Sequence, residues 1–101
     1  MELKEAFGAT LREVRLQRSL TQEDFSIVSS RTMVSLLERA GTSPTLEKLE
    51  ELCSVLGVHP VTLMAACYMR KENSSEIDNF LGGISSELHS LQDNPSARDN
   101  D

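Results

Sequence analysis

The sequence is poor in aromatic residues, with no tryptophan, one tyrosine and three phenylalanines among its 101 residues. Any core must therefore be packed largely with aliphatic side chains. A long apolar run that could span a bilayer is missing, and the first residues mix charges with apolar side chains instead of forming a signal peptide. Apolar residues make up 39% and charged residues 26% of the chain, as in ordinary soluble proteins. We expect a cytoplasmic protein with one small domain and an appendage.

Only two cysteines are present, Cys53 and Cys67, and both lie within apolar-periodic segments. We interpret them as reduced core thiols, and regard a structural disulfide as the weaker alternative. No close-spaced cysteine pair occurs, and His59 and His89 do not complete a metal-ligand set. The chain also has no convergent nucleophile and base and no phosphate-binding glycine loop. We therefore expect no metal, no cofactor and no enzyme activity.

The formal net charge of −6 is distributed unevenly along the chain. Residues 1–71 contain nine basic and nine acidic residues, whereas residues 72–101 contain seven acidic residues and a single basic one, Arg98. A global acidic charge argues against nonspecific coating of nucleic acid. It does not exclude a neutral DNA-reading domain that is followed by an acidic tail.

Helical periodicity extends along most of the chain, and no segment alternates with the period of two that predicts a strand. Apolar residues at steps of three and four predict an amphipathic helix over residues 3–18. Thr21 and Asp24 form a capping-box pattern that begins a short second helix. The first two helices are thus predicted to follow each other closely.

Two further helices are predicted in the second half of the domain. Thr45 caps one that ends at Gly57, and His59 caps another that begins at Pro60, where proline is favoured. We prefer this capping role for His59 over a pH switch. Together with a third helix described below, these segments predict an all-α domain over residues 1–71. The inward faces of the two later helices are formed by Leu46, Leu49, Leu52, Cys53, Leu56, Leu63, Met64 and Cys67.

The segment 72–92 is predicted to form a C-terminal amphipathic helix, and residues 93–101 are predicted to be disordered. Ser75 and Asp78 form a second capping-box pattern. The Gly82-Gly83 pair interrupts the helix and costs about 1 kcal/mol per glycine relative to alanine. The apolar residues of this segment form a stripe along one face of the predicted helix. This stripe either folds back onto the domain or pairs with its copy in a homodimer, and we favour dimerisation. It consists of Ile77, Phe80, Leu81, Ile84, Leu88 and Leu91.

A third helix over residues 30–38, capped by Ser29 or Ser30, has the pattern of a DNA-reading helix. Two of its apolar residues face inward, and a small-polar and basic set is left outward near its N-terminal half. Arginine can bind guanine O6 and N7 in a bidentate way, and serine or threonine can bond a base edge or a phosphate. The outward set consists of Ser30, Arg31, Thr32 and Ser35.

Three blocks of sequence occur in a particular order: LREVRLQRSLTQEDF, then SRTMVSLLER, then SPTLEKLEELCSVLGVHPVTL. In this order and spacing the chain resembles the lambda-repressor-like (Xre-type) helix-turn-helix family over residues 7 to about 69. The resemblance implies a five-helix DNA-binding domain, here followed by the C-terminal helix. It also implies a transcription regulator that acts on symmetric operators, often as a homodimer.

The resemblance also assigns roles to individual positions. Gln22 matches a glutamine that commonly holds a DNA phosphate, and the outward set of the third helix falls on positions that face DNA. Arg15 and Glu38 match a structural ion pair between the first helix and the end of the third. Arg39 is either a further phosphate contact or an ordinary surface charge.

The sequence departs from the family pattern at three places. Between Gln22 and Glu38 it is two residues shorter, and the loss falls where a glycine-containing turn is usual. Ala40 replaces a frequent glycine. Leu36 occupies a position that is commonly polar and base-facing, so Leu36 and its neighbour Met33 either contact bases or are covered by neighbours.

We therefore expect a sequence-specific, dimeric transcription regulator, more specifically a repressor, that binds a double-stranded operator. The alternative is a protein-binding regulator on the same fold, similar to an antitoxin, in which the acidic tail binds a protein partner. Sparse basic residues around the 39–45 loop favour this alternative. Salt-sensitive DNA binding distinguishes the two.

Overall fold

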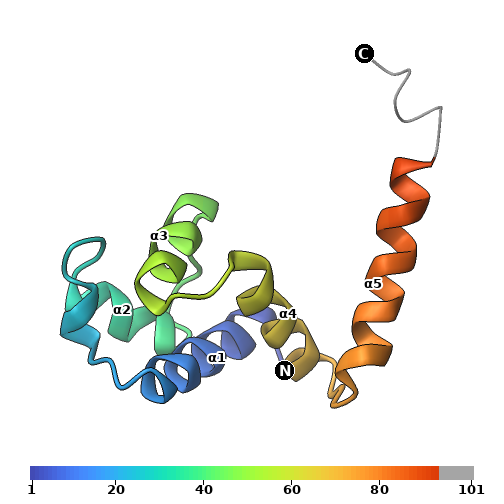
Figure 1. The fold of residues 1–101 in the computed structure, drawn as a ribbon. Coiled ribbons are helices and arrows are strands. Elements are labelled where there is room, and N and C mark those ends of the chain that lie inside the picture. Colours follow the sequence, from blue (N-terminus) through green and yellow to red (C-terminus); the bar gives the residue numbers. More distant parts are fainter. Residues whose placement is uncertain (94–101) are drawn as a thin grey trace.

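A computed structural model describes residues 1–93, and residues 94–101, on which most of the predicted disordered tail falls, lie outside the described part. The described residues contain helices and no strands, which confirms the all-α prediction (Figure 1). Helices α1 to α4 form the body of the molecule. The elements are α1 (Leu3–Gln17), the 3-10 helix η1 (Gln22–Phe25), α2 (Arg31–Glu38), α3 (Leu46–Leu56), α4 (Pro60–Lys71) and α5 (Ile77–Gln92).

Side-chain caps fix the beginnings of four elements, as the sequence predicts. The Thr21 side chain accepts a hydrogen bond from the Asp24 N–H, and the Asp24 side chain accepts one from the Thr21 N–H. Of the two candidates for α2, Ser30 is the cap. Thr45 caps α3, and His59 Nδ1 accepts from the Val61 N–H at the start of α4. Each cap satisfies an otherwise unpaired helix-terminal donor.

Left-handed residues end several helices. Gly57 follows α3 with a φ of 74°, which glycine adopts at no steric cost. Ala40 follows α2 with a φ of 61° and Ser19 follows α1 with a φ of 58°. The backbone at Ala40 thus keeps the conformation that favours glycine although the residue has a Cβ. Left-handed conformation costs a non-glycine residue about 1–2 kcal/mol.

The hydrophobic core lies entirely within α1 to α4 and η1. It includes Phe25, which is fully buried although aromatic residues are scarce. The prediction that Leu46 faces the core is wrong, because its side chain is 81% exposed. Leu46 is the first residue of α3, and the helix reaches the core only one turn later, at Leu49. The buried cluster consists of Phe7, Leu11, Phe25, Val34, Leu37, Leu49, Leu52, Cys53, Leu56, Leu63 and Cys67.

Both cysteines are buried and free. Burial raises the pKa of the Cys53 thiol to about 11, and it also raises the pKa of Cys67. Protonated, buried thiols are poor nucleophiles, so both residues act as small apolar core side chains.

Helices α1 and α2 cross at Gly8. A Cβ atom at this position would lie 2.5 Å from the Leu37 carbonyl oxygen and 2.7 Å from that of Glu38. The sequence reading did not single out this glycine. The sequence contains one indication of its role. Gly8 lies inside a predicted helix, where glycine costs about 1 kcal/mol relative to alanine, and this cost indicates a packing constraint.

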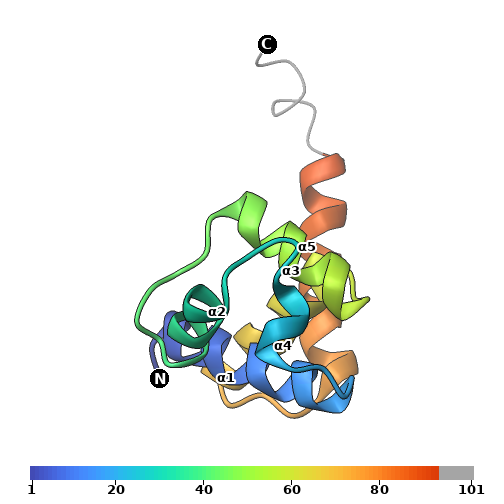
Figure 2. The ribbon, with the colours of Figure 1, turned by 90° about the vertical axis from the view of Figure 1, so that its left-hand side faces the viewer.

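Helix α5 extends away from the body in both ribbon views, and none of its residues is buried (Figures 1 and 2). It therefore does not fold back onto the domain. The helix runs unbroken through Gly82 and Gly83, contrary to the predicted interruption. The predicted Ser75 cap is also wrong, because the N-cap is Glu76, without a side-chain bond. Ser75 lies two residues before the first helical residue, too early to reach its N–H groups.

No single helix within residues 1–93 is long and apolar enough to cross a membrane. Helices α3 and α4 meet that criterion only when they are joined, and they are bent by 102° relative to each other.

Candidate nucleic-acid interface

The connection between η1 and α2, the two elements of the predicted helix-turn-helix, is short. Element η1 is a 3-10 helix of four residues, and the turn 26–29 leads directly to Ser30, the cap of α2. A 3-10 helix rises about 2.0 Å per residue against about 1.5 Å in an α-helix, so fewer residues cover a given length. The larger rise per residue in η1 therefore makes up part of the length that the two missing residues remove. The N–H groups of Val28 and Ser29 both bond the Phe25 carbonyl oxygen, at 2.9 and 2.8 Å.

A lysine from a distant helix holds this turn. The Lys48 ammonium donates a hydrogen bond to the Val28 carbonyl oxygen, and it also lies 3.0 Å from Glu51. Lys48 sits in the first turn of α3, where the helix dipole disfavours a cation. Sequence reading missed this contact, because only the fold brings residues 28 and 48 together.

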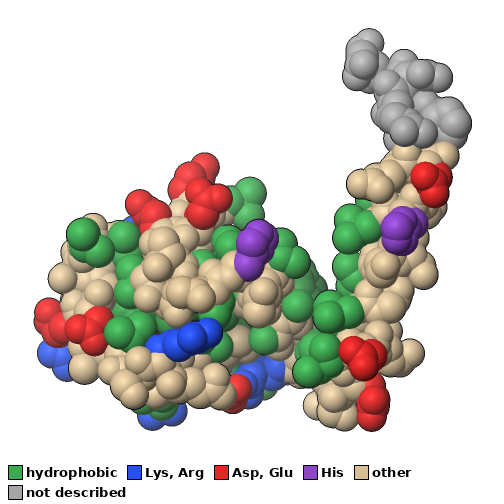
Figure 3. Space-filling view, in the orientation of Figure 1, with side chains coloured by type: hydrophobic (Ala, Val, Ile, Leu, Met, Phe, Trp, Pro, Cys, Tyr) green, Lys and Arg blue, Asp and Glu red, His purple; other side chains and the backbone are tan. Residues whose placement is uncertain are grey.

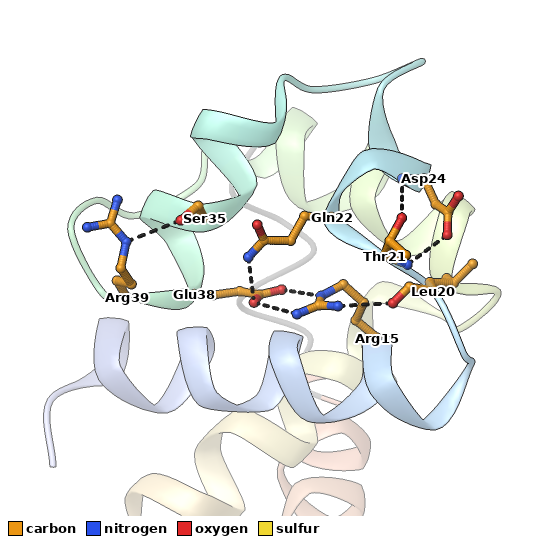
Figure 4. A network of polar contacts seen from close by, with 8 residues as sticks. All are labelled: Arg15, Leu20, Thr21, Gln22, Asp24, Ser35, Glu38 and Arg39. Carbon is orange, nitrogen blue, oxygen red and sulfur yellow. Dashed lines mark hydrogen bonds and ion pairs between the residues drawn. The ribbon is translucent and has the colours of Figure 1, made fainter.

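A buried polar network joins α1, η1 and the end of α2 (Figure 4). Arg15 Nε lies 2.7 Å from Glu38 Oε2, and Arg15 Nη2 lies 3.0 Å from Glu38 Oε1. Arg15 Nη1 donates to the Leu20 carbonyl oxygen. The two side chains are 10% and 4% exposed, and the bond to Glu38 raises the pKa of Arg15. Removing one partner of such a pair costs about 3–5 kcal/mol.

Gln22 belongs to the same network. Its Nε2 donates to Glu38 Oε1 at 3.1 Å, so the carboxylate of α2 orients the glutamine amide. A primary amide has two donor hydrogens and one acceptor oxygen. One hydrogen and the oxygen therefore remain available to an external group. Gln22 can serve the network and a DNA phosphate together.

The outward side chains of α2 differ in how they are engaged. Among residues 1–93, no hydrogen bond involves the side chains of Arg31 or Thr32, and both are exposed. The Ser30 hydroxyl caps the helix by accepting from the Met33 N–H at 3.1 Å, which leaves its own hydrogen free to donate. Ser35 Oγ accepts from Arg39 Nε at 3.2 Å, so these two residues form one polar unit (Figure 4).

The two apolar residues on the outer face of α2, Met33 and Leu36, differ in their exposure. Met33 is 39% exposed. Leu36 is partly buried and lies against Gly41, whose added Cβ would come within 2.4 Å of Leu36 Cδ2. Of the two, Met33 is the more accessible to a ligand in front of α2.

The first turn of α2 is electrostatically unlike that of most other elements. The first turns of α1, η1, α3 and α5 each contain an acidic residue, whereas α2 has none and begins with Arg31. A cation at the positive end of a helix is unfavourable by itself and becomes favourable when an anion binds there. Arg31 and Gln22 also line one open hollow with Arg15, Thr21 and Glu23. The fold thus brings Arg31 and Gln22, two of the predicted DNA contacts, to the same hollow.

Known proteins resemble part of this chain. The helix-turn-helix family matches residues 11–63, from within α1 to within α4. An uncharacterized HTH-type transcriptional regulator, y4dJ of Sinorhizobium fredii, is 35% identical over 66 residues, which cover 63% of this chain and 86% of the relative. No solved structure matches the chain significantly.

Proposed function

Because the chain belongs to the helix-turn-helix family of DNA-binding transcription regulators and is not an enzyme, we propose that it is a homodimeric repressor of a palindromic operator. In this proposal α2 lies in the major groove, with its N-terminal residues against base edges. The site of action is the cytoplasm.

The exposed Arg31 at the acid-free start of α2 carries this proposal. Its guanidinium is available to bind guanine O6 and N7, which is the commonest specific contact in the major groove. Thr32, next to it, offers a hydroxyl for a base edge or phosphate and a methyl group for thymine. The helix dipole adds attraction for the phosphate backbone on either side.

The remaining polar residues are assigned to the phosphate backbone. Gln22 is held by Glu38 with one N–H pointing free, and the Ser30 hydroxyl can donate while it caps the helix. The Ser35–Arg39 unit lies one turn further along α2 and extends the same outer face. These contacts fix register and orientation, and Arg31 and Thr32 supply the sequence preference.

The apolar stripe of α5, which is unburied in the single chain, supports homodimerisation. Two protomers related by a two-fold axis would read half-sites about one helical turn, roughly 34–36 Å, apart. We assign repression because occupancy of an operator is enough to block transcription, and residues 1–93 contain one core-bearing domain.

Selecting bound sequences from a random DNA pool tests the proposal directly, and a palindromic motif is the expected result. Arg31→Ala should cost about 1–3 kcal/mol of operator binding and relax preference at one base pair per half-site. Arg12→Ala removes the same charge from an exposed position on α1 and should change the selected motif little.

Gln22→Ala should instead weaken binding to all sequences alike, because a phosphate contact carries no sequence information. An Arg31→Ala protein that selects the wild-type motif with wild-type affinity would mean that the reading register is wrong. Tight binding to a partner protein without salt-sensitive DNA binding would select the alternative, a protein-docking regulator.

A further inference from the structure

Helix α5 is a helix without a partner in the single chain. It has 16 residues, two of them glycines, and none is buried. An isolated helix of this length is marginal in water, and the glycines weaken it further. Five large apolar residues are 39–64% exposed along it: Ile77, Leu81, Ile84, Leu88 and Leu91. An exposed apolar surface of this kind indicates a site at which another helix or protein packs.

The spacing of these five residues indicates which partner fits. They follow one another at steps of four, three, four and three, which is the 3.5-residue period of a coiled-coil seam. Such a seam fits a second helix with the same period. Gly82 and Gly83 fall on the side away from the seam, where an added Cβ would meet nothing within 4 Å. The glycines therefore leave no hole in the interface.

The pattern also distinguishes between two helix directions. In a parallel, in-register pair each seam residue meets its own copy, so all five positions form layers. In an antiparallel pair the order of the steps is reversed, and at most four positions can align. The parallel arrangement therefore buries more apolar surface, and burial is the main source of stability for such a pair.

Charge beside the seam is compatible with the parallel pair. The flanking positions contain two acids, Asp78 and Glu87, and no lysine or arginine occurs within 72–93. In a parallel pair a residue faces the partner's residue five positions later. Glu87 then faces Gln92 and Phe80 faces Ser85, so no acid meets an acid.

The base of α5 offers additional apolar surface. Ile77 and Leu81 line a groove of about 280 Å³ together with Val61, Thr62, Ala65, Ala66 and Met69, all of α4. In the space-filling view, apolar side chains along one edge of α5 continue onto the body at this point (Figure 3). The seam and the α4 surface therefore form one continuous apolar face.

We propose that α5 pairs in parallel and in register with α5 of a second copy of this chain, through the seam of Ile77, Leu81, Ile84, Leu88 and Leu91. This inference rests on the proposed homodimer and specifies its geometry. The two-fold axis runs along the helix pair, so both DNA-binding domains lie at the same end of the pair.

The proposed coiled coil contains two helices, one from each copy of the chain. Leucine at 81 and 88 with isoleucine at 77 and 84 is by itself a pattern that favours wider bundles. A wider bundle would bury the Glu87 side chains of several copies close together, with no lysine or arginine in α5 to pair with them. Burying unpaired charge costs several kcal/mol, which outweighs the packing preference.

Disulfide trapping of Leu91→Cys tests the direction of the pair. Position 91 discriminates because an antiparallel pair would place the two copies of residue 91 at opposite ends. Under mild oxidation most of this variant should become a covalent dimer. Ser86→Cys, on the outward side of the same helix, should remain mostly uncrosslinked. The buried Cys53 and Cys67 should leave the wild type unlinked.

Light scattering on the full chain separates the failure of this inference from the failure of the proposed function. A two-chain mass with no Leu91→Cys trapping would overturn the parallel pair and leave the homodimer standing. A four-chain mass would overturn the two-stranded arrangement. A single-chain mass would overturn both the helix pair and the homodimer. If that monomer still selected a DNA motif, the proposed function as a DNA-binding regulator would stand.

Discussion

At Gly8 the first helix passes so close to α2 that there is no room for a methyl group beside the carbonyl oxygens of Leu37 and Glu38. These are backbone atoms in the last turn of α2, so they cannot rotate out of the way. The distance between α1 and α2 is therefore set by the absence of a side chain at one position. A larger residue would move the helix that carries Arg31.

We predict that Gly8→Ala destabilises the domain. Alanine gains about 1 kcal/mol in helix propensity, whereas overpacking costs about 1–3 kcal/mol, and contact with rigid backbone places the cost at the upper end. Urea unfolding should show a net loss of stability, and operator affinity should fall as α2 shifts.

Gly83→Ala is the matched control, because an added Cβ there meets nothing within 4 Å. It should stabilise α5 through propensity alone. Equal stability of Gly8→Ala and wild type would show that α1 and α2 can separate at little cost.

At the residue scale, the sequence was sufficient where the causes are local. Thr21, Thr45 and His59 were predicted as caps, and so was one of Ser29 and Ser30 for α2. The structure confirms the first three and selects Ser30, because a cap depends on the chain within three residues. Gly8 could not be identified in this way, since the atoms that exclude a side chain belong to another helix.

At the scale of elements, the hydrogen bond from Lys48 to the Val28 carbonyl ties α3 to the turn in front of α2. The turn is short and lacks glycine, and its Val28 carbonyl oxygen is paired with an ammonium group from outside the turn. This bond limits the angle at which α2 leaves the turn.

We predict that Lys48→Met lowers stability by about 1–2 kcal/mol, because it keeps the aliphatic stem and removes a charged donor. The ratio of specific to nonspecific DNA binding should also fall, since a looser turn aims Arg31 less well. Lys48→Arg keeps a donor and should restore the ratio.

Glu51→Gln is a second control, because it removes only a surface ion pair, which is worth about 0–1 kcal/mol. Salt dependence gives a separate readout for Lys48→Met. If Lys48 instead contacts phosphate, the slope of log affinity against log salt should decrease by about one unit in magnitude. That result, with an unchanged specificity ratio, would contradict the positioning role.

Element boundaries were predictable where apolar periodicity and caps agree, as in α3 and α4, and for α1 apolar periodicity was enough. The winding of η1 was not, because four residues have no periodicity that distinguishes a 3-10 from an α-helix, and the length available between α1 and α2 decides it. The glycine pair in α5 predicted an interruption, but an exposed helix without a competing contact tolerates it.

At the scale of the molecule, the core and the arm are separate. Every residue of the buried cluster belongs to α1–α4 or η1, and α5 contributes none. The domain over residues 1–71 therefore does not need α5 for its packing. The stripe alone could not tell a folded-back helix from a pairing helix, because both arrangements bury the same residues.

We predict that deletion of residues 72–101 leaves a folded monomer that binds its operator far more weakly. Two linked reading domains gain about 10²–10⁴ in affinity over one, and the deletion removes this gain. Circular dichroism should show retained helix, light scattering a single-chain mass, and titration a large loss for the full operator. A half-site, which one domain occupies, should be bound equally by both proteins. An unchanged dimer would locate the interface in α1–α4.

The charge balance of residues 1–71 affects how the protein is shared between its operator and the rest of the genome. With as many acids as bases in this segment and an acidic arm behind it, few phosphates are neutralised on random DNA. Nonspecific binding depends almost entirely on that neutralisation. We therefore expect random DNA to retain little of the protein. If the proposed function holds, occupancy of the operator should follow the concentration of the protein with little delay.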